Sequence, residues 1–85
     1  MELTQLKYFQ ALARHKNFTQ AAKSISVSQS ALSRSIAKLE QELGAPLLNR
    51  HGKETELTEA GEKFLFHVDR VLREMDVARQ EIKMD

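Results

Sequence analysis

The sequence contains no cysteine, one proline and three glycines among its 85 residues. Without thiols it cannot form a disulfide scaffold or a thiolate metal site, as is usual for a protein of a reducing compartment. The low proline and glycine content excludes a collagenous or linker-like chain, and a hydrophobic fraction of 41% is too high for a disordered tail. We therefore expect one small globular domain, which is too short for most enzyme folds.

Long apolar runs are also missing. The longest uninterrupted ones are two or three residues, far short of the roughly 20 that a membrane-spanning helix needs. The beginning of the chain lacks the basic-then-apolar pattern of an export leader. These features predict a protein that neither crosses a membrane nor is exported, and we interpret it as cytoplasmic.

Acidic residues are absent from one long stretch. None lies between Leu3 and Leu39, where six basic side chains do. Residues 1–53 carry eight basic and three acidic side chains, a net charge of +5, whereas residues 54–85 carry five and nine, a net charge of −4. This asymmetry indicates a surface in the first half that faces an anionic polymer, with a merely solvated basic face as the alternative.

Hydrophobic periodicity and capping residues predict two helices at the start of the chain. The first begins near Thr4 and ends around Asn17. The second begins at Thr19, whose hydroxyl is placed to accept hydrogen bonds from the first turn, and runs to Ile25. The tripeptide at 26–28 then breaks the pattern and, because it contains no glycine, is expected to avoid positive φ angles.

A third helix and a small hairpin follow. Ser28 is the expected N-cap of this helix, and Gly44 is its expected left-handed C-terminal residue. Pro46 prevents the helix from continuing. Residues 47–50 and 55–57 are the segments with strand character, and they predict a two-stranded hairpin.

The last helix is long for so small a domain. Thr58 is placed to cap it, and its pattern continues almost to Asp85. Its apolar positions alternate in steps of four and three, as in a heptad seam. They are Phe64, Val68, Val71, Met75, Ala78 and Ile82. The alternative is that the seam packs against its own domain, and we expect Phe64 and Val68 to pack inward at the domain body. Because the outer part has nothing left in a small domain to cover it, we expect a second copy of the chain to do so.

The second and third helices carry the strongest functional signal. Two short helices joined by three residues have the helix-turn-helix geometry that presents one helix to the major groove of DNA. Outside its apolar stripe, the third helix presents Gln29, Ser30, Ser33, Arg34, Ala37 and Lys38. Gln29 can pair with adenine and Arg34 with guanine, while serines can contact base edges or phosphate. An ordinary amphipathic helix with a serine-rich surface is the alternative.

Two motifs allow a more specific interpretation: FTQAAKSISVSQSALSRSIAKLEQELGAPLLNR at residues 18–50 and LTEAGEKFL at residues 57–65. With them, the chain resembles the N-terminal DNA-binding segment of LysR-type transcriptional regulators over nearly its whole length. The resemblance implies a mainly α fold. Residues 1–58 would form a winged helix-turn-helix with three helices and a two-stranded wing, and residues 59–85 a long linker helix that dimerises.

The resemblance also implies roles for particular residues. Those matching Gln29, Ser30, Ser33 and Arg34 would face base edges or nearby phosphates, and those matching Arg50 and Lys53 would belong to a wing that reaches the neighbouring minor groove. Lys53 stands where the family commonly has arginine, which favours phosphate contact over insertion into a narrow groove. The full set of candidate DNA-binding residues is Thr19, Ser28, Gln29, Ser30, Ser33, Arg34, Lys38, Arg50 and Lys53.

Family members also have an effector-sensing C-terminal domain, which this sequence lacks. We therefore expect the chain to be the DNA-binding portion of a longer bacterial regulator, or a truncated relative. Its expected partners are a dyad-symmetric operator in double-stranded DNA and a second copy of the chain, as a homodimer or a higher homo-oligomer. No membrane and no small-molecule site are expected in this fragment.

Other classes of function find little support in the sequence. The three histidines, His15, His51 and His67, share no metal-ligand spacing, and no cofactor or metal is expected. No glycine loop that could cradle phosphates and no strained nucleophile turn is present, so we expect no enzyme. A winged-helix adaptor for an acidic protein is the main alternative, and an architectural DNA binder without sequence preference is another. An adaptor would need an apolar anchor on the outward face of the third helix, where the sequence has polar residues.

Overall fold

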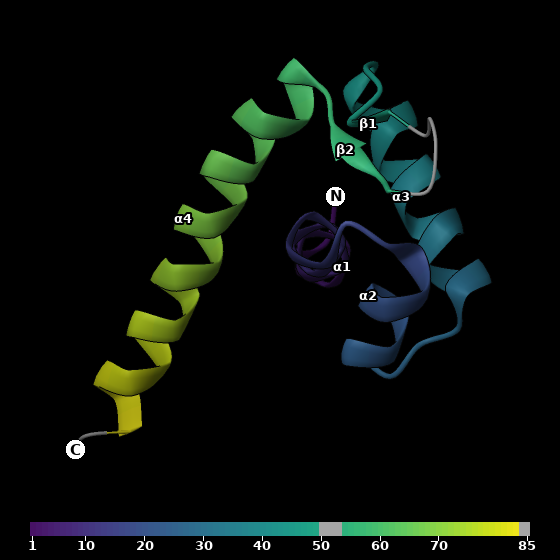
Figure 1. Ribbon diagram of the computed structural model, residues 1–85. Coiled ribbons are helices and arrows are strands. Elements are labelled where there is room, and N and C mark those ends of the chain that lie inside the picture. Colours follow the sequence, from purple (N-terminus) through teal and green to yellow (C-terminus); the bar gives the residue numbers. More distant parts are fainter. Residues whose placement is uncertain (50–53, 84–85) are drawn as a thin grey trace.

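Four helices and one two-stranded antiparallel sheet make up the computed structural model, which describes residues 1–49 and 54–83 (Figure 1). In chain order the elements are α1 (Leu3–His15), α2 (Phe18–Ser24), α3 (Gln29–Leu43), β1 (Leu48–Asn49), β2 (Glu56–Leu57) and α4 (Glu59–Lys83). The first three helices and the sheet form one body, while α4 leaves it as a rod. The molecule is therefore elongated, with principal extents of 49 × 25 × 18 Å.

The core of the body is built from the apolar stripes of α1 and α3. Phe9 and Leu12 of α1 and Leu32, Ile36 and Leu39 of α3 are all buried. On each helix they recur in steps of three or four, so one face of the helix points inward and the other is left free. The core thus fixes which face of α3 is available for function.

The beginning of α2 differs from the sequence-based expectation. Asn17, and not Thr19, caps the helix: its side-chain oxygen accepts a hydrogen bond from the backbone nitrogen of Gln20 at 3.0 Å. Because α2 begins at Phe18, Thr19 already lies in the first turn. Its hydroxyl is therefore free to serve another purpose.

The expectation that the turn between α2 and α3 avoids positive φ was wrong. Ser26 adopts the left-handed conformation with a φ of 56°. Its backbone nitrogen donates to the carbonyl of Lys23 at 3.3 Å, and that of Val27 donates to the carbonyl of Ala22 at 3.0 Å. This pair of bonds is the Schellman motif, which satisfies the last carbonyls of a helix. It offsets the roughly 1–2 kcal/mol that a residue with a side chain loses in this conformation.

Both predicted ends of α3 are confirmed. The hydroxyl of Ser28 accepts a hydrogen bond from the backbone nitrogen of Ala31 at 3.0 Å. Gly44 takes the left-handed conformation with a φ of 72°, and its backbone nitrogen donates to the carbonyl of Glu40 at 2.8 Å. Local sequence chemistry therefore set the length of this helix.

The sheet is shorter than expected, with Leu48 opposite Leu57 and Asn49 opposite Glu56. Leu47 pairs with the second strand through its carbonyl only, which accepts from the backbone nitrogen of Thr58, the residue opposite it in register. Its nitrogen instead donates to the carboxylate of Glu40 at 2.7 Å, so the ladder ends there. The outer end of the expected first strand, Arg50, and the glycine at the hairpin turn lie outside the described residues.

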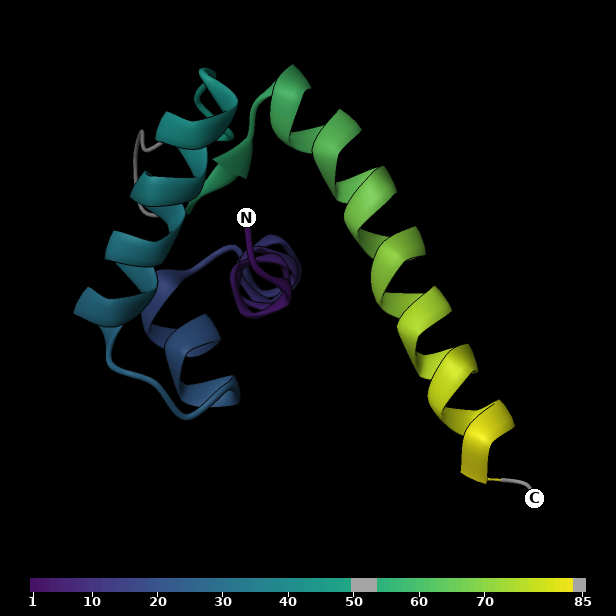
Figure 2. The ribbon, with the colours of Figure 1, turned by 180° about the vertical axis from the view of Figure 1, so that it is seen from behind.

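The first half of α4 is fixed to the body. Thr58 caps it as predicted, since its hydroxyl accepts from the nitrogen of Gly61 at 2.9 Å and donates to the carbonyl of Pro46 at 2.7 Å. A side chain at position 61 would run into the carbonyl oxygen of Leu47, so only glycine allows this close approach. The helix contacts α1 and β2, and Figures 1 and 2 show its outer end standing apart from α1, α2 and α3.

Candidate nucleic-acid interface

The outward face of α3 carries the predicted DNA-reading residues. Gln29, Ser30, Arg34 and Lys38 are exposed, and Ser33 is half-buried. Ser30, Arg34 and Lys38 follow one another at intervals of four, so they form one row along the helix. Figure 1 shows α3 on the side of the body away from α4, so α4 does not cover it.

A hydrogen bond connects α2 with the start of α3. The hydroxyl of Thr19 donates to the side-chain oxygen of Gln29 at 3.1 Å. The amide nitrogen of Gln29 then stays available as a donor, and its oxygen keeps one unused lone pair. This arrangement restrains the side chain that is best suited to adenine while leaving both of its polar atoms able to contact a base.

The N-terminus of α3 is exposed beside this amide. Ser28 uses its hydroxyl for the cap, and the same oxygen lies 3.3 Å from the hydroxyl of Ser30. The first backbone nitrogens of a helix have no partners within the helix, and the macrodipole makes this end positive. The start of α3 is therefore suited to bind a phosphate. Ser28 contributes indirectly, because its hydroxyl caps the helix end that would face the phosphate.

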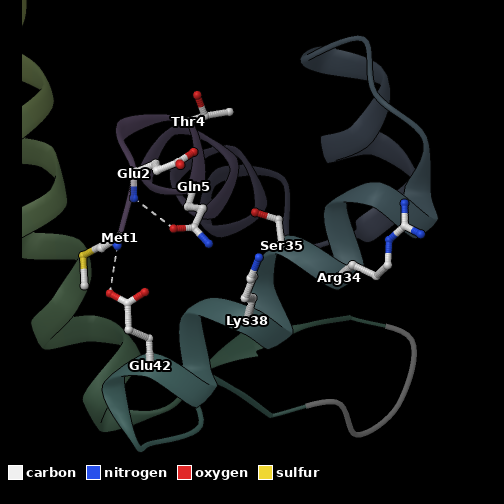
Figure 3. Close-up of a pocket in the computed structure, with 8 residues that line it drawn as sticks. All are labelled: Met1, Glu2, Thr4, Gln5, Arg34, Ser35, Lys38 and Glu42. Atoms are coloured by element: carbon white, nitrogen blue, oxygen red, sulfur yellow. Dashed lines mark hydrogen bonds and ion pairs between the residues drawn. The ribbon is translucent and has the colours of Figure 1, made fainter.

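Arg34 and Lys38 border a hollow of about 520 Å³ between α3 and the start of α1 (Figure 3). Figure 3 shows the side chain of Arg34 reaching away from the residues of α1, whereas Lys38 points toward Gln5 and Ser35. Neither side chain has an ion-pair partner in the part of the chain that the structure describes. The two cationic side chains thus point in different directions: Arg34 points outward, and Lys38 points along the edge of α3.

The start of α1 was not among the residues singled out from the sequence. It borders the same hollow as Lys38. Glu2 and Gln5 form a capping box there, in which the backbone nitrogen of Glu2 donates to the Gln5 side chain at 2.9 Å. The nearby ion pair between the Met1 amino group and Glu42, at 3.0 Å, joins this segment to α3. The capping pattern could have located the helix start, but only the packing of α1 on α3 brings it to this edge.

The base of the wing is anchored on two sides. Glu40 of α3 accepts hydrogen bonds from the backbone nitrogens of Leu47 and Leu48 at 2.7 and 3.3 Å. On the other strand, the nitrogen of Thr55 donates to the carbonyl of Lys16 at 2.9 Å. The wing residues expected to contact DNA, Arg50 and Lys53, lie outside the described residues.

The predicted seam of α4 divides into a buried and an exposed part. Val68 is only 2% exposed and belongs to the core of its own domain, and Phe64 is half-buried with its ring 5.4 Å from that of Phe9. In contrast, Val71, Met75 and Ile82 are 42%, 38% and 77% exposed. Val68 fits the spacing of the seam, and it packs inward at the domain body as expected, so it does not belong to the exposed part.

A shallow apolar groove of about 300 Å³ continues the exposed seam toward the body. It runs between the end of α3 and the first turns of α4, and its lining includes Leu43, Leu47, Ala60 and Phe64. Leu43, the last position of the predicted apolar stripe of α3, is 38% exposed here. The groove and the seam together form one apolar surface on the outside of the molecule.

Within residues 1–49 and 54–83, no group of three or more histidine, aspartate or glutamate side chains is arranged to hold a metal ion, and His51 lies outside that part of the chain. None of the helices in the same ranges combines the length and the hydropathy needed to cross a membrane.

Comparison with known sequences identifies relatives along nearly the whole chain. The family model described as "Bacterial regulatory helix-turn-helix protein, lysR family" matches residues 3–62. The uncharacterized HTH-type transcriptional regulator YybE of Bacillus subtilis is 48% identical over 98% of this chain and 28% of its own length. BudR of Klebsiella aerogenes, an HTH-type transcriptional regulator, is 45% identical over 98% of this chain and 58% of its own length. This chain therefore spans only part of the length of these relatives.

Solved structures resemble this fold closely. BenM_DBD in a complex with benA site 1 DNA superimposes with a TM-score of 0.95, at 36% identity, over 99% of this chain and 98% of that one. CbnR_DBD in a complex with DNA gives a TM-score of 0.92, at 39% identity, over 99% of this chain and 97% of that one. The predicted winged helix-turn-helix fold is thereby confirmed.

Proposed function

This chain belongs to the LysR family of bacterial regulatory helix-turn-helix proteins, and we propose that it binds a dyad-symmetric operator in double-stranded DNA as a homodimer. The observation that carries the proposal is the exposed face of α3, where Gln29, Arg34 and Lys38 stand among serines and the carboxylate of Glu42, one turn beyond Lys38, is paired with the Met1 amino group. Polar and cationic side chains with small neighbours suit a helix that enters the major groove. A protein-interaction adaptor would instead require an aromatic or aliphatic anchor on this face.

The proposed roles follow from the direction of each side chain. Gln29 and Arg34 read base edges, with Thr19 restraining Gln29 through its hydroxyl. Ser30 and Ser33 contact a base edge or a phosphate from the same face. Sequence readout is thus assigned to the first half of α3.

Phosphate contacts are assigned to the edges of this face. The exposed N-terminus of α3, capped by Ser28, suits one phosphate. Lys38 and the start of α1 border the same hollow and suit another phosphate. Arg50 and Lys53 in the wing contact the neighbouring backbone or minor groove. These contacts fix the register of the protein without reading the sequence.

The proposed dimer uses the exposed apolar surface of α4. Val71, Met75, Ala78 and Ile82 lie on one side of the rod, beyond the part that packs on α1. Antiparallel pairing of two such rods would place the outer end of each over the groove between α3 and α4 of the other copy, which is apolar and about 300 Å³ in volume. One continuous interface would then bury both the seam and the groove.

The two-fold symmetry of such a dimer constrains the operator. Two recognition helices that enter successive major grooves on one face of the duplex are about 34–36 Å apart, or a multiple of this distance. We therefore expect the operator to consist of two inverted half-sites separated by a central segment that the protein does not contact. Its place of action is the cytoplasm, where bacterial DNA is found, and its relatives' names as transcriptional regulators favour a regulator without catalytic activity.

Selection of bound sequences from a random pool of double-stranded DNA tests this function. The wild-type chain should enrich inverted repeats, and footprinting should show two protected half-sites on one face of the duplex. The matched variant Arg34→Ala should enrich sequences with a relaxed preference at one symmetric position. Binding without any enrichment would support an architectural DNA binder, and no binding to DNA would support the adaptor.

A further inference from the structure

A second basic surface lies on the side of α1 that faces away from α3. It is a groove of about 400 Å³ between α1, the end of α2 and the middle of α4. Its cationic or polar rim is formed by Lys7, Arg14 and His15. Its apolar surface is formed by Ala11, Ile25 and Leu72. We call it the α1 groove.

The position of the α1 groove follows from the helical period. Lys7 and Arg14 are seven residues, or two turns, apart and therefore share one face of α1. Phe9 and Leu12, which point into the core toward α3, lie on the opposite face. A duplex that rests on the outward face of α3 is thus separated from the groove by α3 and α1.

The cations of the groove have no ion-pair partner in the part of the chain that the structure describes. The ion pairs of residues 1–49 and 54–83 join other groups, and no carboxylate there lies within ion-pair distance of Lys7 or Arg14. Asp69 of α4 accepts a hydrogen bond from the side chain of Gln10, a residue of the groove lining, at 2.7 Å. The negative end of the α1 dipole favours Arg14, which lies in the last turn, but Lys7 lies outside that turn.

The dimensions of the groove distinguish between possible anions. Lys7 and Arg14 are separated by about 10 Å along the helix axis, at 1.5 Å per residue, so a single carboxylate cannot contact both. Ala11 and Leu72, which are buried, form an apolar floor between the two cations. A phosphate backbone has no apolar group to place on this floor. The groove therefore fits two carboxylates about two helical turns apart with an apolar side chain between them.

We propose that the α1 groove docks an acidic amphipathic segment of a partner protein. The cations attract and orient the segment, and burial of its apolar residue on Ala11, Ile25 and Leu72 supplies the specific contact. The site is separate from both the DNA-reading face of α3 and the exposed seam of α4, so the protein can hold the partner while it is bound to an operator as a dimer.

A designed peptide tests the proposal on the full chain. The probe is a fluorescein-labelled helical peptide with two glutamates seven residues apart and leucines between them, and its control has glutamines in place of the glutamates. Fluorescence anisotropy should detect binding of the first peptide and not of the second. Lys7→Glu and Arg14→Glu should each weaken binding by about tenfold, since each removes one close charge pair and adds repulsion.

Two matched charge reversals serve as controls. Arg70→Glu removes an exposed cation whose guanidinium lies 5.7 Å from the Phe66 ring on α4, outside the groove lining. Lys38→Glu removes a cation from the proposed DNA interface. Both should leave peptide binding within about twofold of wild type, because distant sites are independent. Lys7→Gln provides a milder variant whose circular dichroism should match that of wild type.

Several outcomes would overturn the proposal. Peptide binding that survives Lys7→Glu, or that Lys38→Glu abolishes, would place the peptide elsewhere. Equal binding of the glutamine peptide would exclude charge recognition. Loss of DNA binding or of the dimer in Lys7→Glu, with an intact fold, would assign the groove to DNA or to the second copy.

Discussion

The free faces of α3 and α4 differ in kind, although both helices are amphipathic. The body uses nearly the whole apolar stripe of α3, so what is left outside is polar, with Arg34 and Lys38 on the half before Glu42. The body covers α4 only as far as Leu72 and only on one side, so Val71, which faces away from it, and Met75 and Ile82, which lie beyond it, stay on the surface. A free face suits the partner whose chemistry completes it: nucleic acid for α3 and a second apolar surface for α4.

Substitutions in the exposed seam of α4 should have the largest effect, because they remove the apolar surface that distinguishes α4 from α3. Val71→Asp combined with Met75→Asp would bury four like charges in the proposed interface, so the protein should become a folded monomer. Its affinity for a two-site operator should fall roughly a hundredfold to ten-thousandfold, because binding of the second half-site is no longer intramolecular. Sedimentation measures the oligomeric state, and circular dichroism checks the fold.

The matched control for the seam places the same charges on the other side of α4. Phe66→Asp with Val77→Asp changes two exposed apolar residues, 61% and 41% exposed, that lie eleven positions apart and so share one face. This control should stay dimeric and keep its operator affinity. A seam variant that still forms dimers would assign the interface to another surface.

The junction between the body and α4 should respond to Gly61→Ala. The added methyl group would meet the carbonyl oxygen of Leu47, and backbone cannot move aside as a flexible side chain does. We expect a loss of about 1–3 kcal/mol in the free energy of unfolding, or more if α4 detaches. Urea unfolding at a fixed protein concentration measures it.

Lys63→Ala is the control for this junction, since the Lys63 side chain is exposed at the edge of the groove and its amine lies 3.5 Å from Glu59 on the helix surface. It should change the free energy of unfolding by less than about 0.5 kcal/mol. Equal stability of the two variants would mean that α4 does not depend on its close approach to the sheet.

Base readout by α3 should respond to Arg34→Ala. Loss of a bidentate contact costs about 1–3 kcal/mol and relaxes preference at one base pair of each half-site. Binding to a series of operator variants measures both effects, with Arg70→Ala as the control on α4. Uniform weakening on every sequence would instead assign Arg34 to a phosphate.

The smallest expected effect concerns the charge of the wing. If Lys53 neutralises one phosphate, Lys53→Ala should weaken all sequences alike and reduce the slope of log affinity against log salt by about one unit. Titrations at several salt concentrations measure this slope, and Lys63→Ala should leave it unchanged. An unaltered slope for Lys53→Ala would remove this residue from the interface.

Local chemistry explains where prediction of the elements succeeded. Ser28, Gly44 and Thr58 act as caps through contacts with neighbouring backbone, so their roles could be predicted from a few residues of sequence. Ser26 could not be predicted in the same way. Two backbone hydrogen bonds at the end of α2 stabilise its left-handed conformation, but no glycine or asparagine, the residues that favour it, marks the position in the sequence.

The candidate interface was predictable to a similar extent. Helical periodicity identified the polar face of α3, because the period of the helix alone separates it from the apolar stripe. The hydrogen bond from Thr19 to Gln29, and the position of Gln5 at the hollow beside Lys38, depend on how α1, α2 and α3 pack. No pattern within one helix contains that information.

By itself, the sequence determined the type and order of the elements, the caps of α3 and α4, and the polar character of the face that α3 presents, because each follows from residues within a few turns of one another. Only the tertiary structure decided how α4 is rotated on α1. Val68 and Met75 fit the same spacing, yet Val68 is 2% exposed and Met75 is 38% exposed. Heptad spacing fixes which residues share a side of a helix, but contact with Phe9 and the close approach at Gly61 fix which side turns inward and where the body ends.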